Sequence, residues 1–397
     1  MTKDHELSDL TNKTTMMITF NYPPQIGGIE TLVHDIVGNY PGRVIVLAPR
    51  QKGCEDFDRV QKYETVRVLC PSSSLFRIPF FFLQAFLICR KNQIHHIQSA
   101  NIFPAVVSML ISRLFKISYS IFAMGKEVYV LNTALRSKMY RRLFQKVLCS
   151  ADRILSISDF TSGEVLKLGV KRERIFKIPS GIDTKALDKF DSQRFLDFKN
   201  RVTRELRIEN RQIILTIARL VERKGQDYVI RAMQKVALTN PQAVYIVVGG
   251  GPERQRLEHL VDELGLREYV KFAGRVPDED IVCYYRFAQI FILASRLVEA
   301  TADVEGFGQV FLEANYCGLP VIGGRSGGIV DSVEHGKTGF LVDPEDAEDI
   351  ARAIVVLLND SQLRESFGVY GRKRVIEQFD HGCTVEAVKK GLGGVYL

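Results

Sequence analysis

The sequence has few of the features that mark secreted proteins, membrane-spanning proteins or proteins stabilised by a structural metal. Its seven cysteines are dispersed and form no CxxC pair, so neither a disulfide framework nor a cysteine zinc site is expected. The longest apolar run, residues 78–89, is interrupted only by Gln84 and is shorter than the ~20 residues that a spanning helix needs. Residues 1–13 are polar and do not resemble a signal peptide. We therefore expect a cytoplasmic protein with reduced thiols.

The composition is that of an ordinary globular protein. Hydrophobic residues make up 46% and charged residues 25% of the sequence, which excludes a disordered or fibrous chain. This leaves enough apolar surface to form a core without disulfide or metal staples. At the usual ~100–200 residues for each domain, the 397 residues predict two domains.

Basic residues are concentrated in the first half of the sequence. Residues 1–200 contain 29 lysines and arginines against 18 acids, and the remainder contains 25 against 28. This asymmetry indicates an anionic partner for the first half, and a membrane surface, a phosphorylated acceptor and nucleic acid all fit. Nucleic acid is not an expected partner, because the sequence has no RRM, KH or helix-turn-helix signature and no interleaved aromatic residues.

Short runs rich in valine and isoleucine alternate with helical patterns along the whole chain. Such runs are typical of parallel strands that are buried on both faces, and therefore of βαβ units. The predicted fold class is α/β, with two doubly wound Rossmann-like domains that face each other across a cleft. The expected strands are residues 16–20, 44–47, 66–69, 94–98, 118–122, 154–157, 175–178, 213–217, 244–248, 270–272, 290–293, 320–322 and 339–342.

The strand pattern restarts near the middle of the chain, and this sets the expected domain boundaries. Residues 1–13 form a polar tail, and residues 14–184 and 211–377 form the two Rossmann-like domains. The charged residues 185–210 between them are expected to be a linker with a short helix. Residues 378–397 are expected to form a C-terminal helix that crosses back to the first domain.

Doubly wound sheets bind ligands where the carboxyl ends of their strands meet helix N-termini. Two strand-to-helix turns contain adjacent glycines, one with Gly27 and Gly28 and the other with Gly250. Glycine permits the backbone to approach a ligand closely, but it equally permits a tight turn with positive φ, so both roles stay open. The first turn does not read GxGxxG, which counts against a dinucleotide-dependent dehydrogenase.

A further turn, after the expected strand 213–217, carries Arg219 and Lys224. A guanidinium and an ammonium group at the end of a strand and beside a helix N-terminus suit a diphosphate leaving group. The alternative is a solvated basic turn, and Glu222 and Arg223 are expected to be surface charges of that kind.

The strongest motif is residues 303–314, in which Glu305 and Glu313 stand eight residues apart. If a helix begins near Gly308, Glu305 lies in the loop before it and Glu313 lies within it, so the two carboxylates can bind different hydroxyl groups of one ligand. Gly306 and Gly308 leave backbone N–H groups bare at the same place. The alternatives are a complement to the helix dipole at Glu305 and a surface charge at Glu313.

On these residues the sequence resembles the retaining glycosyltransferases of family 4, which have the GT-B fold, and among them the GDP-mannose-dependent phosphatidylinositol mannosyltransferases. The similarity rests on residues 219–227, 303–306 and 313–328 and covers nearly the whole chain. It implies transfer of a hexose, with mannose from GDP-mannose as the best expectation, to a hydroxyl of a lipid-linked or polysaccharide acceptor. A UDP-hexose-dependent transferase of the same family and a nucleotide-sugar epimerase with the same fold are the alternatives.

The resemblance also implies roles for individual residues. Arg219 and Lys224 would bind the donor diphosphate and Glu305 would hold the transferred sugar, and these three are the expected catalytic residues. The expected donor-binding residues are Gly27, Gly28, Gly250, Arg275, Val276, Gly306, Phe307, Gly308, Gln309 and Glu313. No cofactor and no metal is implied, and the DxD spacings at residues 56–58 and 278–280 are expected to be solvated loop charges.

One acceptor-side turn departs from the family pattern. The family usually has a histidine before the glycine, and here the turn places Met124 before Gly125 and Lys126. Methionine cannot donate a hydrogen bond to a sugar hydroxyl. Either Lys126 or another group takes this role, or the donor sugar is held differently, or the protein is a weak or silent nucleotide-sugar-binding relative. His95 and His96 are expected to be strand-end or core residues.

The acceptor is expected to bind the basic first domain. Residues 133–149 predict an amphipathic helix with arginines and lysines on one face, and the phenylalanine-rich residues 76–87 precede it. Together they can rest on an anionic membrane, which would place the protein on the inner face of that membrane. A helix that packs in the core and exposes only its polar face fits the same pattern equally well.

Overall fold

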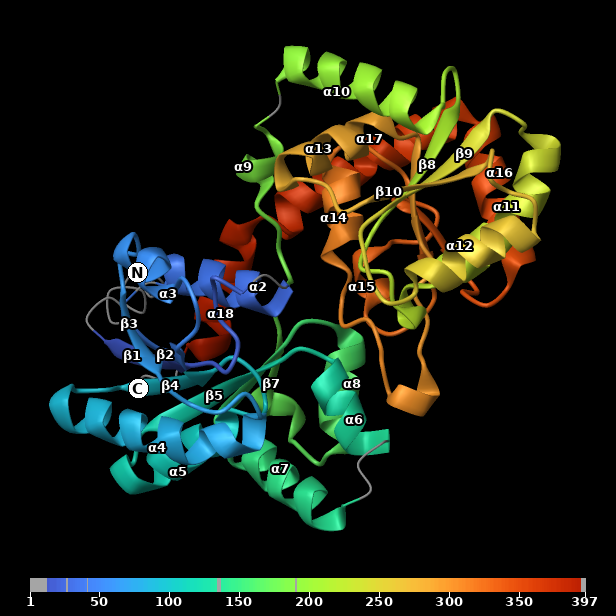
Figure 1. The fold of residues 1–397 in the computed structure, drawn as a ribbon. Helices are drawn as coiled ribbons and strands as arrows, with labels where there is room; N and C mark the ends of the chain where they lie inside the picture. Colours follow the sequence, from blue (N-terminus) through green and yellow to red (C-terminus); the bar gives the residue numbers. More distant parts are fainter. Residues whose placement is uncertain (1–12, 26–27, 41, 134–136, 190, 394–397) are drawn as a thin grey trace, which may run out of the picture. The chain divides into compact units, whose positions relative to one another are not determined.

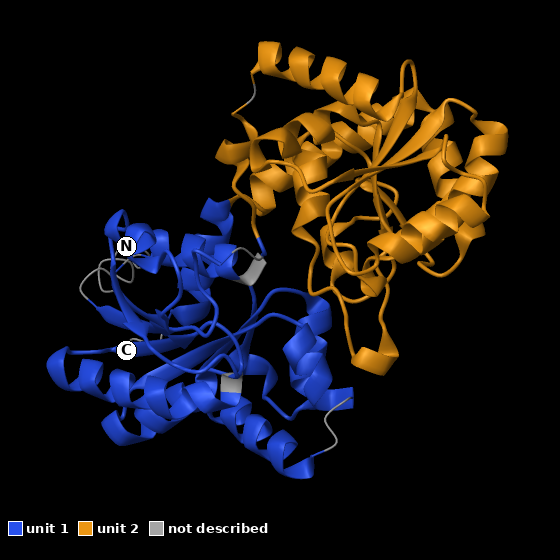
Figure 2. Cartoon of the chain, in the orientation of Figure 1, with its two compact units in different colours: residues 1–180, 381–397 blue, residues 181–380 orange. Residues whose placement is uncertain are grey.

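The computed structural model describes residues 13–25, 28–40, 42–133, 137–189 and 191–393. The chain divides into two compact units (Figures 1 and 2). Unit 1 is Met1–Ser180 together with His381–Leu397, and unit 2 is Gly181–Asp380. Each unit has a parallel sheet with helices on its faces, so the predicted class of two doubly wound Rossmann-like α/β domains is confirmed.

Unit 1 is built on a seven-stranded parallel sheet with the order β3-β2-β1-β4-β5-β6-β7. Its central strands form from the apolar runs because their side chains are covered on both faces; Met16, Met17 and Ile18 of β1 are fully buried. The strands are β1 (Thr14–Ile18), β2 (Arg43–Pro49), β3 (Glu64–Val68), β4 (His96–Ser99), β5 (Ser118–Ala123), β6 (Arg153–Ser156) and β7 (Ile175–Lys177).

Helices cover both faces of this sheet, with α4, α5 and α7 on one side and α2 and α18 on the other (Figure 1). The helices of unit 1 are α2 (Gly28–Gly38), α3 (Cys54–Arg59), α4 (Ser74–Lys91), α5 (Ala105–Phe115), α6 (Lys126–Thr133), α7 (Lys138–Ser150), α8 (Asp159–Lys167), η1 (Arg172–Arg174) and α18 (His381–Leu392). We expected residues 378–397 to return to the first domain, and α18 packs against β6, β7 and α2.

Unit 2 has a six-stranded parallel sheet with the order β10-β9-β8-β11-β12-β13. Its strands are β8 (Gln212–Ile217), β9 (Ala243–Val248), β10 (Val270–Gly274), β11 (Ile290–Leu293), β12 (Val321–Gly324) and β13 (Gly339–Val342). Its helices are α9 (Thr184–Leu187), α10 (Ser192–Leu206), η2 (Glu222–Lys224), α11 (Gln226–Thr239), α12 (Arg254–Glu263), α13 (Asp278–Phe287), η3 (Glu299–Thr301), α14 (Gln309–Tyr316), α15 (Ile329–Ser332), α16 (Ala347–Asn359) and α17 (Ser361–Gln378).

The segment that we expected to be a linker, residues 185–210, lies within unit 2. Helix α10 packs on α13, where the buried ring of Phe198 meets the ring of Tyr284 edge-on at 4.8 Å. The sequence of α10 looks polar because only one narrow stripe of the helix is buried. The division between the units falls after Ser180 instead.

The two DxD spacings are ion-pair sites on helices, so the expectation of solvated loop charges is wrong for Asp58 and Asp280. Asp58 of α3 accepts two hydrogen bonds from Arg67, at 2.7 and 2.9 Å. Asp280 of α13 is buried and pairs with Arg194 and Arg201 of α10. Both carboxylates therefore anchor neighbouring elements, which sequence spacing alone does not reveal.

Two general properties of the chain bear on its environment. All seven cysteines are free thiols. Among the residues that the structure describes, no helix combines the length and the apolar composition that crossing a bilayer requires.

Candidate active site

The turn after β8 is held tightly against the end of the neighbouring strand β11. It contains η2 and ends at Gly225, whose φ of +68° favours glycine. A Cβ atom at Gly225 would lie 1.9 Å from the carbonyl oxygen of Ala294, so this approach excludes any side chain at position 225. The turn therefore brings Lys224 next to the loop that follows β11.

Lys224 and Glu305, two of the expected site residues, form an ion pair in this loop. Lys224 Nζ lies 2.5 Å from Glu305 Oε2, and Arg223 Nη1 lies 3.0 Å from the same oxygen. Arg223 also pairs with Asp303, at 3.2 Å from Nε to Oδ1. The expectation that Arg223 is a surface charge is wrong, because its guanidinium is largely buried between two carboxylates.

The surrounding cations keep Glu305 ionised. Burial acts to raise the pKa of its carboxyl, but the charges of Lys224 and Arg223 outweigh burial and hold the pKa below its ordinary value. The Lys224 and Glu305 side chains are only 11% and 15% exposed, so solvent screens the pair weakly. An anion that binds here must compete with Glu305 for Lys224.

The backbone after Glu305 is shaped by glycines, and it leads into α14. Gly308 has a φ of +87° and caps the helix, so the expectation of a helix start near Gly308 is confirmed. The carbonyl oxygen of Glu305 accepts a hydrogen bond from the N–H of Gly328 at 2.9 Å. The N–H groups of residues 306–309 donate no hydrogen bond to any described residue. They form a set of bare amides at a helix N-terminus, which favours an anion or a hydroxyl oxygen.

The side chains of this segment serve packing within unit 2. Phe307 is 4% exposed, and its ring centroid lies 5.8 Å from that of Phe379. Gln309 Nε2 donates a hydrogen bond to the carbonyl oxygen of Gly181 at 2.7 Å. The ring of Phe307 is therefore committed to packing, whereas Gln309 commits one N–H of its amide to Gly181.

Glu313 lies one turn into α14 and has a different environment from Glu305. Tyr285 donates its hydroxyl to Glu313 Oε2 at 2.7 Å. Burial raises the pKa of the Glu313 carboxyl, and the hydrogen bond from Tyr285 opposes this only in part. Burial and the nearby carboxylate also raise the pKa of Tyr285 well above its ordinary value, so its hydroxyl stays a donor.

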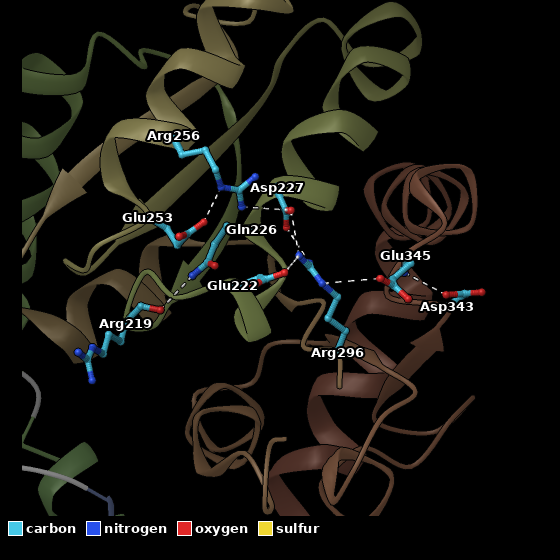
Figure 3. A network of polar contacts seen from close by, with 9 residues as sticks. All are labelled: Arg219, Glu222, Gln226, Asp227, Glu253, Arg256, Arg296, Asp343 and Glu345. Atoms are coloured by element: carbon cyan, nitrogen blue, oxygen red, sulfur yellow. Dashed lines mark hydrogen bonds and ion pairs between the residues drawn. The ribbon is translucent and has the colours of Figure 1, made fainter. Parts of the chain in front are cut away.

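Among the described residues, Arg219 forms no hydrogen bond or ion pair with Lys224 or Glu305. Its backbone carbonyl oxygen accepts a hydrogen bond from Gln226 Nε2 at 3.3 Å, while its side chain is exposed and points away from the other labelled residues (Figure 3). Among the described residues, its guanidinium has no hydrogen-bond or ion-pair partner. The Arg219 guanidinium is therefore exposed to solvent, where an anion can pair with it.

A buried ion-pair network lies behind the turn and was not foreseen from the sequence (Figure 3). Arg296, which follows β11, forms a two-pronged contact with Asp227 of α11, at 2.8 and 3.0 Å. Arg256 adds a third contact to Asp227, at 3.3 Å. Burial acts to raise the pKa of Asp227, but the two arginines outweigh it and lower the pKa. The N–H of Arg296 also donates to the carbonyl oxygen of Arg223, at 2.8 Å, so the network fixes the backbone that carries Lys224.

Gly250 and Arg275, expected to contact the donor, lie together at the ends of β9 and β10. A Cβ atom at Gly250 would lie 3.0 Å from Arg275 Nε, so the arginine side chain lies over the glycine. Arg275 is exposed, whereas Val276 is half-buried against the core of unit 2. Gly250 therefore gives Arg275 the space in which it lies.

The expected residues of unit 1 are spread more widely. Gly27 lies outside the described residues, and Gly28 is the first residue of α2. Met124 follows β5 and is 6% exposed, while its N–H donates to Glu127 Oε1 at 2.6 Å. Burial raises the pKa of Glu127 despite this hydrogen bond. Lys126 is exposed as the first residue of α6, so it does not converge with the buried Met124.

The two neighbouring histidines are structural. His95 Nδ1 accepts a hydrogen bond from the N–H of Thr14 at 3.0 Å. His96 is fully buried between the hydroxyls of Ser118 and Ser120, at 2.9 and 2.7 Å. Burial lowers the pKa of His96 to about 3, so the ring stays neutral and serves the sheet.

Helix α7, within the predicted amphipathic segment 133–149, buries most of its apolar side, although Met139 is 73% exposed. Phe144, Val147 and Leu148 belong to the core of unit 1, and Arg141 and Arg142 are exposed. The buried residues of α7 fit the core-packing alternative, with a solvated basic face.

Comparisons with known proteins show the family of the chain. The model described as "Glycosyltransferase Family 4" matches residues 26–186, and that described as "Glycosyl transferases group 1" matches residues 198–374. The chain is 29% identical over 373 residues to the GDP-mannose-dependent alpha-(1-6)-phosphatidylinositol monomannoside mannosyltransferase of Mycolicibacterium smegmatis, which covers 92% of this chain and 94% of that protein. It is 35% identical over 212 residues to the D-inositol 3-phosphate glycosyltransferase of Corynebacterium jeikeium, covering 50% of this chain and 49% of that protein.

Solved structures show the same fold at lower identity. The Anabaena protein HepE in complex with UDP has a TM-score of 0.79 and 20% identity, with coverage of 96% of this chain and 99% of that chain. WaaG, a glycosyltransferase involved in lipopolysaccharide biosynthesis, has a TM-score of 0.68 and 17% identity, with coverage of 96% and 100%. Both likenesses identify the architecture as GT-B.

Proposed function

Because the chain belongs to the family 4 glycosyltransferases and is itself a glycosyltransferase, we propose that it moves a hexose from a nucleotide diphosphate sugar to an acceptor hydroxyl with retained anomeric configuration. The proposed donor is GDP-mannose, the donor named for its mycobacterial relative. The observation that carries the proposal is the Lys224–Glu305 pair at the bare N-terminus of α14.

In this proposal the cations of unit 2 bind the leaving group. The bond between the anomeric carbon and the diphosphate oxygen breaks, and its electron pair stays on the diphosphate. Lys224, already placed by Glu305, and the exposed Arg219 stabilise that charge, as does the helix N-terminus. The acceptor oxygen attacks the anomeric carbon from the same face, and its hydroxyl proton passes to the departing diphosphate oxygen, so the step uses no protein nucleophile. The family resemblance supports this order of events.

The two carboxylates take different parts of the donor. Glu305 and the N–H groups of residues 306–309 would hold the transferred sugar, and Glu313 would bind the ribose hydroxyls. Gly250 and Arg275 would lie beside the base, and Gly28 would approach the phosphates. A carboxylate is a natural partner for two vicinal hydroxyls, because each of its oxygens accepts one hydrogen bond.

The turn at Met124 bears on the rate of the reaction. A buried thioether cannot donate a hydrogen bond to the sugar, and Lys126 is on the surface. We propose that the chain keeps donor binding in unit 2 and loses part of the rate that a histidine at position 124 would supply. The variant Met124→His places a histidine at this position. It would raise the rate of transfer and leave the affinity for free GDP unchanged.

The proposed acceptor is a lipid-linked or glycan hydroxyl that is reached from the cytoplasmic face of an anionic membrane. The phosphatidylinositol monomannoside named for the relative is a lipid of this kind. A UDP-hexose donor is the second candidate, and it is supported by the UDP and UDP-glucose complexes of HepE.

A donor screen tests the proposal. Thermal shift and hydrolysis are measured with GDP-mannose, UDP-glucose, UDP-galactose and UDP-N-acetylglucosamine, in the presence and absence of EDTA. We expect stabilisation and slow hydrolysis with GDP-mannose, unaffected by EDTA. If only a UDP-sugar stabilises the protein, the donor is that UDP-sugar and not GDP-mannose. A changed anomeric configuration in the transfer product would overturn the proposal of retention.

A further inference from the structure

Two cations and two carboxylates of unit 2 form one cluster at the turn after β8, and the proposed reaction uses only half of it. Lys224 and Glu305 take part in the reaction, whereas Arg223 and Asp303 have no role in it. The positive and negative charges of the four side chains balance. A diphosphate adds only negative charge, so one cation of the cluster must become available before it can bind there.

Arg223 contacts both carboxylates of the cluster at once. Its Nε lies 3.2 Å from Asp303 Oδ1, and its Nη1 lies 3.0 Å from Glu305 Oε2. A guanidinium can do this because its N–H groups point in fixed directions within one plane. Lys224 carries a compact charge, and in the part of the chain that the structure describes its ammonium contacts only Glu305. Lys224 therefore serves one acid, and that acid already has a second cation.

The backbone on both sides of the Arg223–Asp303 pair is fixed. The carbonyl oxygen of Arg223 accepts a hydrogen bond from the N–H of Arg296 at 2.8 Å. Asp303 and Val298 form an antiparallel bridge with hydrogen bonds of 2.9 and 3.2 Å. The side chains of Arg223 and Asp303 are only 24% and 23% exposed. Solvent therefore screens the pair weakly, which favours a guanidinium that stays with its acids when an anion approaches.

The two cations share one oxygen of Glu305. Lys224 and Arg223 both donate to Oε2, at 2.5 and 3.0 Å, while no described residue donates to Oε1. If Lys224 turns to a phosphate, Oε2 keeps Arg223 as its partner, and Oε1 can still accept a hydrogen bond from a hydroxyl group. Without Arg223, the same movement would leave a carboxylate that is 15% exposed with no cation beside it. Such a carboxylate is poorly solvated, so its loss of Lys224 would weaken anion binding.

We propose that Arg223 is a positioning residue that makes Lys224 available to the donor diphosphate. Arg223 balances Asp303 and Glu305 together, keeps Glu305 in place as an anion, and leaves the charge of Lys224 for the ligand. That the ligand is a nucleotide diphosphate sugar rests on the proposed function. The role of Arg223 itself requires only an anion at Lys224, so inorganic pyrophosphate can probe it separately.

Calorimetric titration with GDP tests the proposal. Arg223→Gln is expected to bind GDP about tenfold or more weakly than the wild type, because Lys224 is then the only cation left for Glu305. Arg223→Lys keeps the charge but reaches one carboxylate at a time, so its affinity is expected to lie between the two. This variant also decides the question if Arg223→Gln does not fold. Affinities equal to that of the wild type would overturn the proposal.

The matched control is Arg194→Gln. Arg194 likewise contacts two carboxylates of unit 2, those of Glu279 and Asp280, each at 3.1 Å. It lies on α10 and takes no part in the proposed site. We expect this variant to bind GDP as the wild type does. An equal loss of affinity in Arg194→Gln and Arg223→Gln would show a general effect on the fold and overturn the proposal.

A double variant separates a positioning role from a merely structural one. Arg223→Gln/Glu305→Gln also removes the carboxylate that competes for Lys224, so its affinity for GDP is expected to recover toward that of the wild type. If Arg223 only supported the fold, the second substitution would add to the damage and the affinity would not recover. GDP is the probe because it lacks the sugar that Glu305 is proposed to hold.

Proton uptake gives a second readout of the same role. Lys224 and Arg223 are the cations that hold the pKa of Glu305 below its ordinary value, and Asp303 lies beyond Arg223. In Arg223→Gln, a ligand that takes Lys224 leaves Glu305 without a cation, so its pKa rises on binding and the carboxyl takes up a proton. The affinity of this variant for its ligand is therefore expected to increase as the pH falls from about 7 to about 5.5, more steeply than that of the wild type.

GDP-mannose is the probe for this measurement, because both of its phosphates are esterified and do not titrate in that range. Titrations in two buffers with different ionisation enthalpies count the protons taken up. More proton uptake in Arg223→Gln than in the wild type is expected, and equal uptake would overturn the proposal.

Inorganic pyrophosphate distinguishes a failure of this inference from a failure of the proposed function. If the wild type binds pyrophosphate more tightly than Arg223→Gln but turns over no donor, the proposed function is wrong and the role of Arg223 stands. If the wild type turns over a donor and Arg223→Gln binds GDP and pyrophosphate equally well, the role of Arg223 is wrong and the proposed function stands. A wild type that binds neither anion would overturn both.

Discussion

Glu305 and Glu313 stand eight residues apart, both are largely buried, and their pKa values move in opposite directions. Glu305 lies in the loop before α14, where Lys224 and Arg223 outweigh burial and lower its pKa. Glu313 lies within α14, where a hydroxyl from Tyr285 only partly offsets burial and the pKa is raised. The difference teaches that burial alone does not set the charge of a carboxylate; the kind of partner does. Helix α14 and the loop before it thus carry one carboxyl group that ionises more readily than usual and one that retains its proton more strongly.

The strongest test of this contrast removes the cation. Lys224→Ala leaves a buried carboxylate with one cation fewer, and we expect a loss of about 3 kcal/mol in the free energy of unfolding. Affinity for GDP is expected to fall roughly ten- to a hundredfold, since charge-assisted hydrogen bonds to phosphate are lost. Urea unfolding and calorimetric titration with GDP measure the two effects.

The control for that experiment is Lys235→Ala. Lys235 pairs with Glu348 on the surface, and its side chain is 59% exposed. Little change in stability and none in GDP affinity is expected. If Lys224→Ala binds GDP as the wild type does, the assignment of the diphosphate site is wrong.

The next test loosens the network that fixes the turn. Arg296→Lys keeps the charge but loses the two-pronged contact with Asp227, so we expect a loss of about 2 kcal/mol in stability. Because Arg296 is a positioning residue, the donor KM is expected to rise more than kcat falls. Arg267→Lys is the control, since Arg267 makes the same two-pronged contact with Asp262 at an exposed site. If the donor KM of Arg296→Lys equals that of the wild type, the ion-pair network does not position the donor site.

A pH titration of stability sharpens the contrast directly. Glu305 has a lowered pKa, so it stabilises the fold above its ordinary value of 4.5, and this is lost as the pH falls through the folded pKa. Glu313 has a raised pKa, so it costs stability as the pH rises from 4.5 through the folded pKa. At neutral pH we therefore expect Glu305→Gln to be less stable and Glu313→Gln more stable than the wild type. Curves that shift in the same direction would contradict the opposite pKa shifts.

For the variants Glu313→Gln and Glu313→Ala we also predict the affinity for GDP. If Glu313 binds the ribose hydroxyls, both variants lose affinity for GDP although Glu313→Gln gains stability. Stability and binding would then change in opposite senses at one residue, which a purely structural role does not produce.

The smallest effect is expected at Tyr285. Tyr285→Phe removes the only hydroxyl that donates to Glu313 among the described residues, and we expect a loss of about 1 kcal/mol in stability. The pKa of Glu313 should rise further, since one stabilising hydrogen bond to the carboxylate is gone. The shift is read from the carboxyl resonance of Glu313 in an NMR titration, and an unchanged pKa would contradict it.

The fold was predictable because it depends on local signals. Each of the thirteen predicted strands overlaps an observed one, since valine and isoleucine runs record burial on both faces of a sheet. The helix start at Gly308 was equally accessible, because glycine marks the turn. Residues 185–210 were misjudged as a linker, because one buried stripe in α10 is a weak signal among so many charges.

The site was only partly predictable, because its contacts join distant residues. Arg296 meets Asp227 across 69 positions, and Arg223 meets Glu305 across 82. No spacing rule selects such partners, although Asp227 stands in the segment that carried the family resemblance. Packing likewise decides which apolar residues of a helix are buried: in α7 it buries Phe144 and Val147 but leaves Met139 exposed.

The return of α18 to unit 1 has a consequence for biosynthesis. Helix α18 contacts β6, β7 and α2, and Thr384 Oγ1 donates to the carbonyl oxygen of Pro179 at 3.0 Å. Unit 2 is an uninterrupted stretch of chain, whereas unit 1 is begun first and finished last. During synthesis, unit 2 can therefore complete its folding before α18 is available to complete unit 1. A premature stop codon shortly before residue 381 would remove α18 and so destabilise unit 1, the part of the protein that is synthesised first.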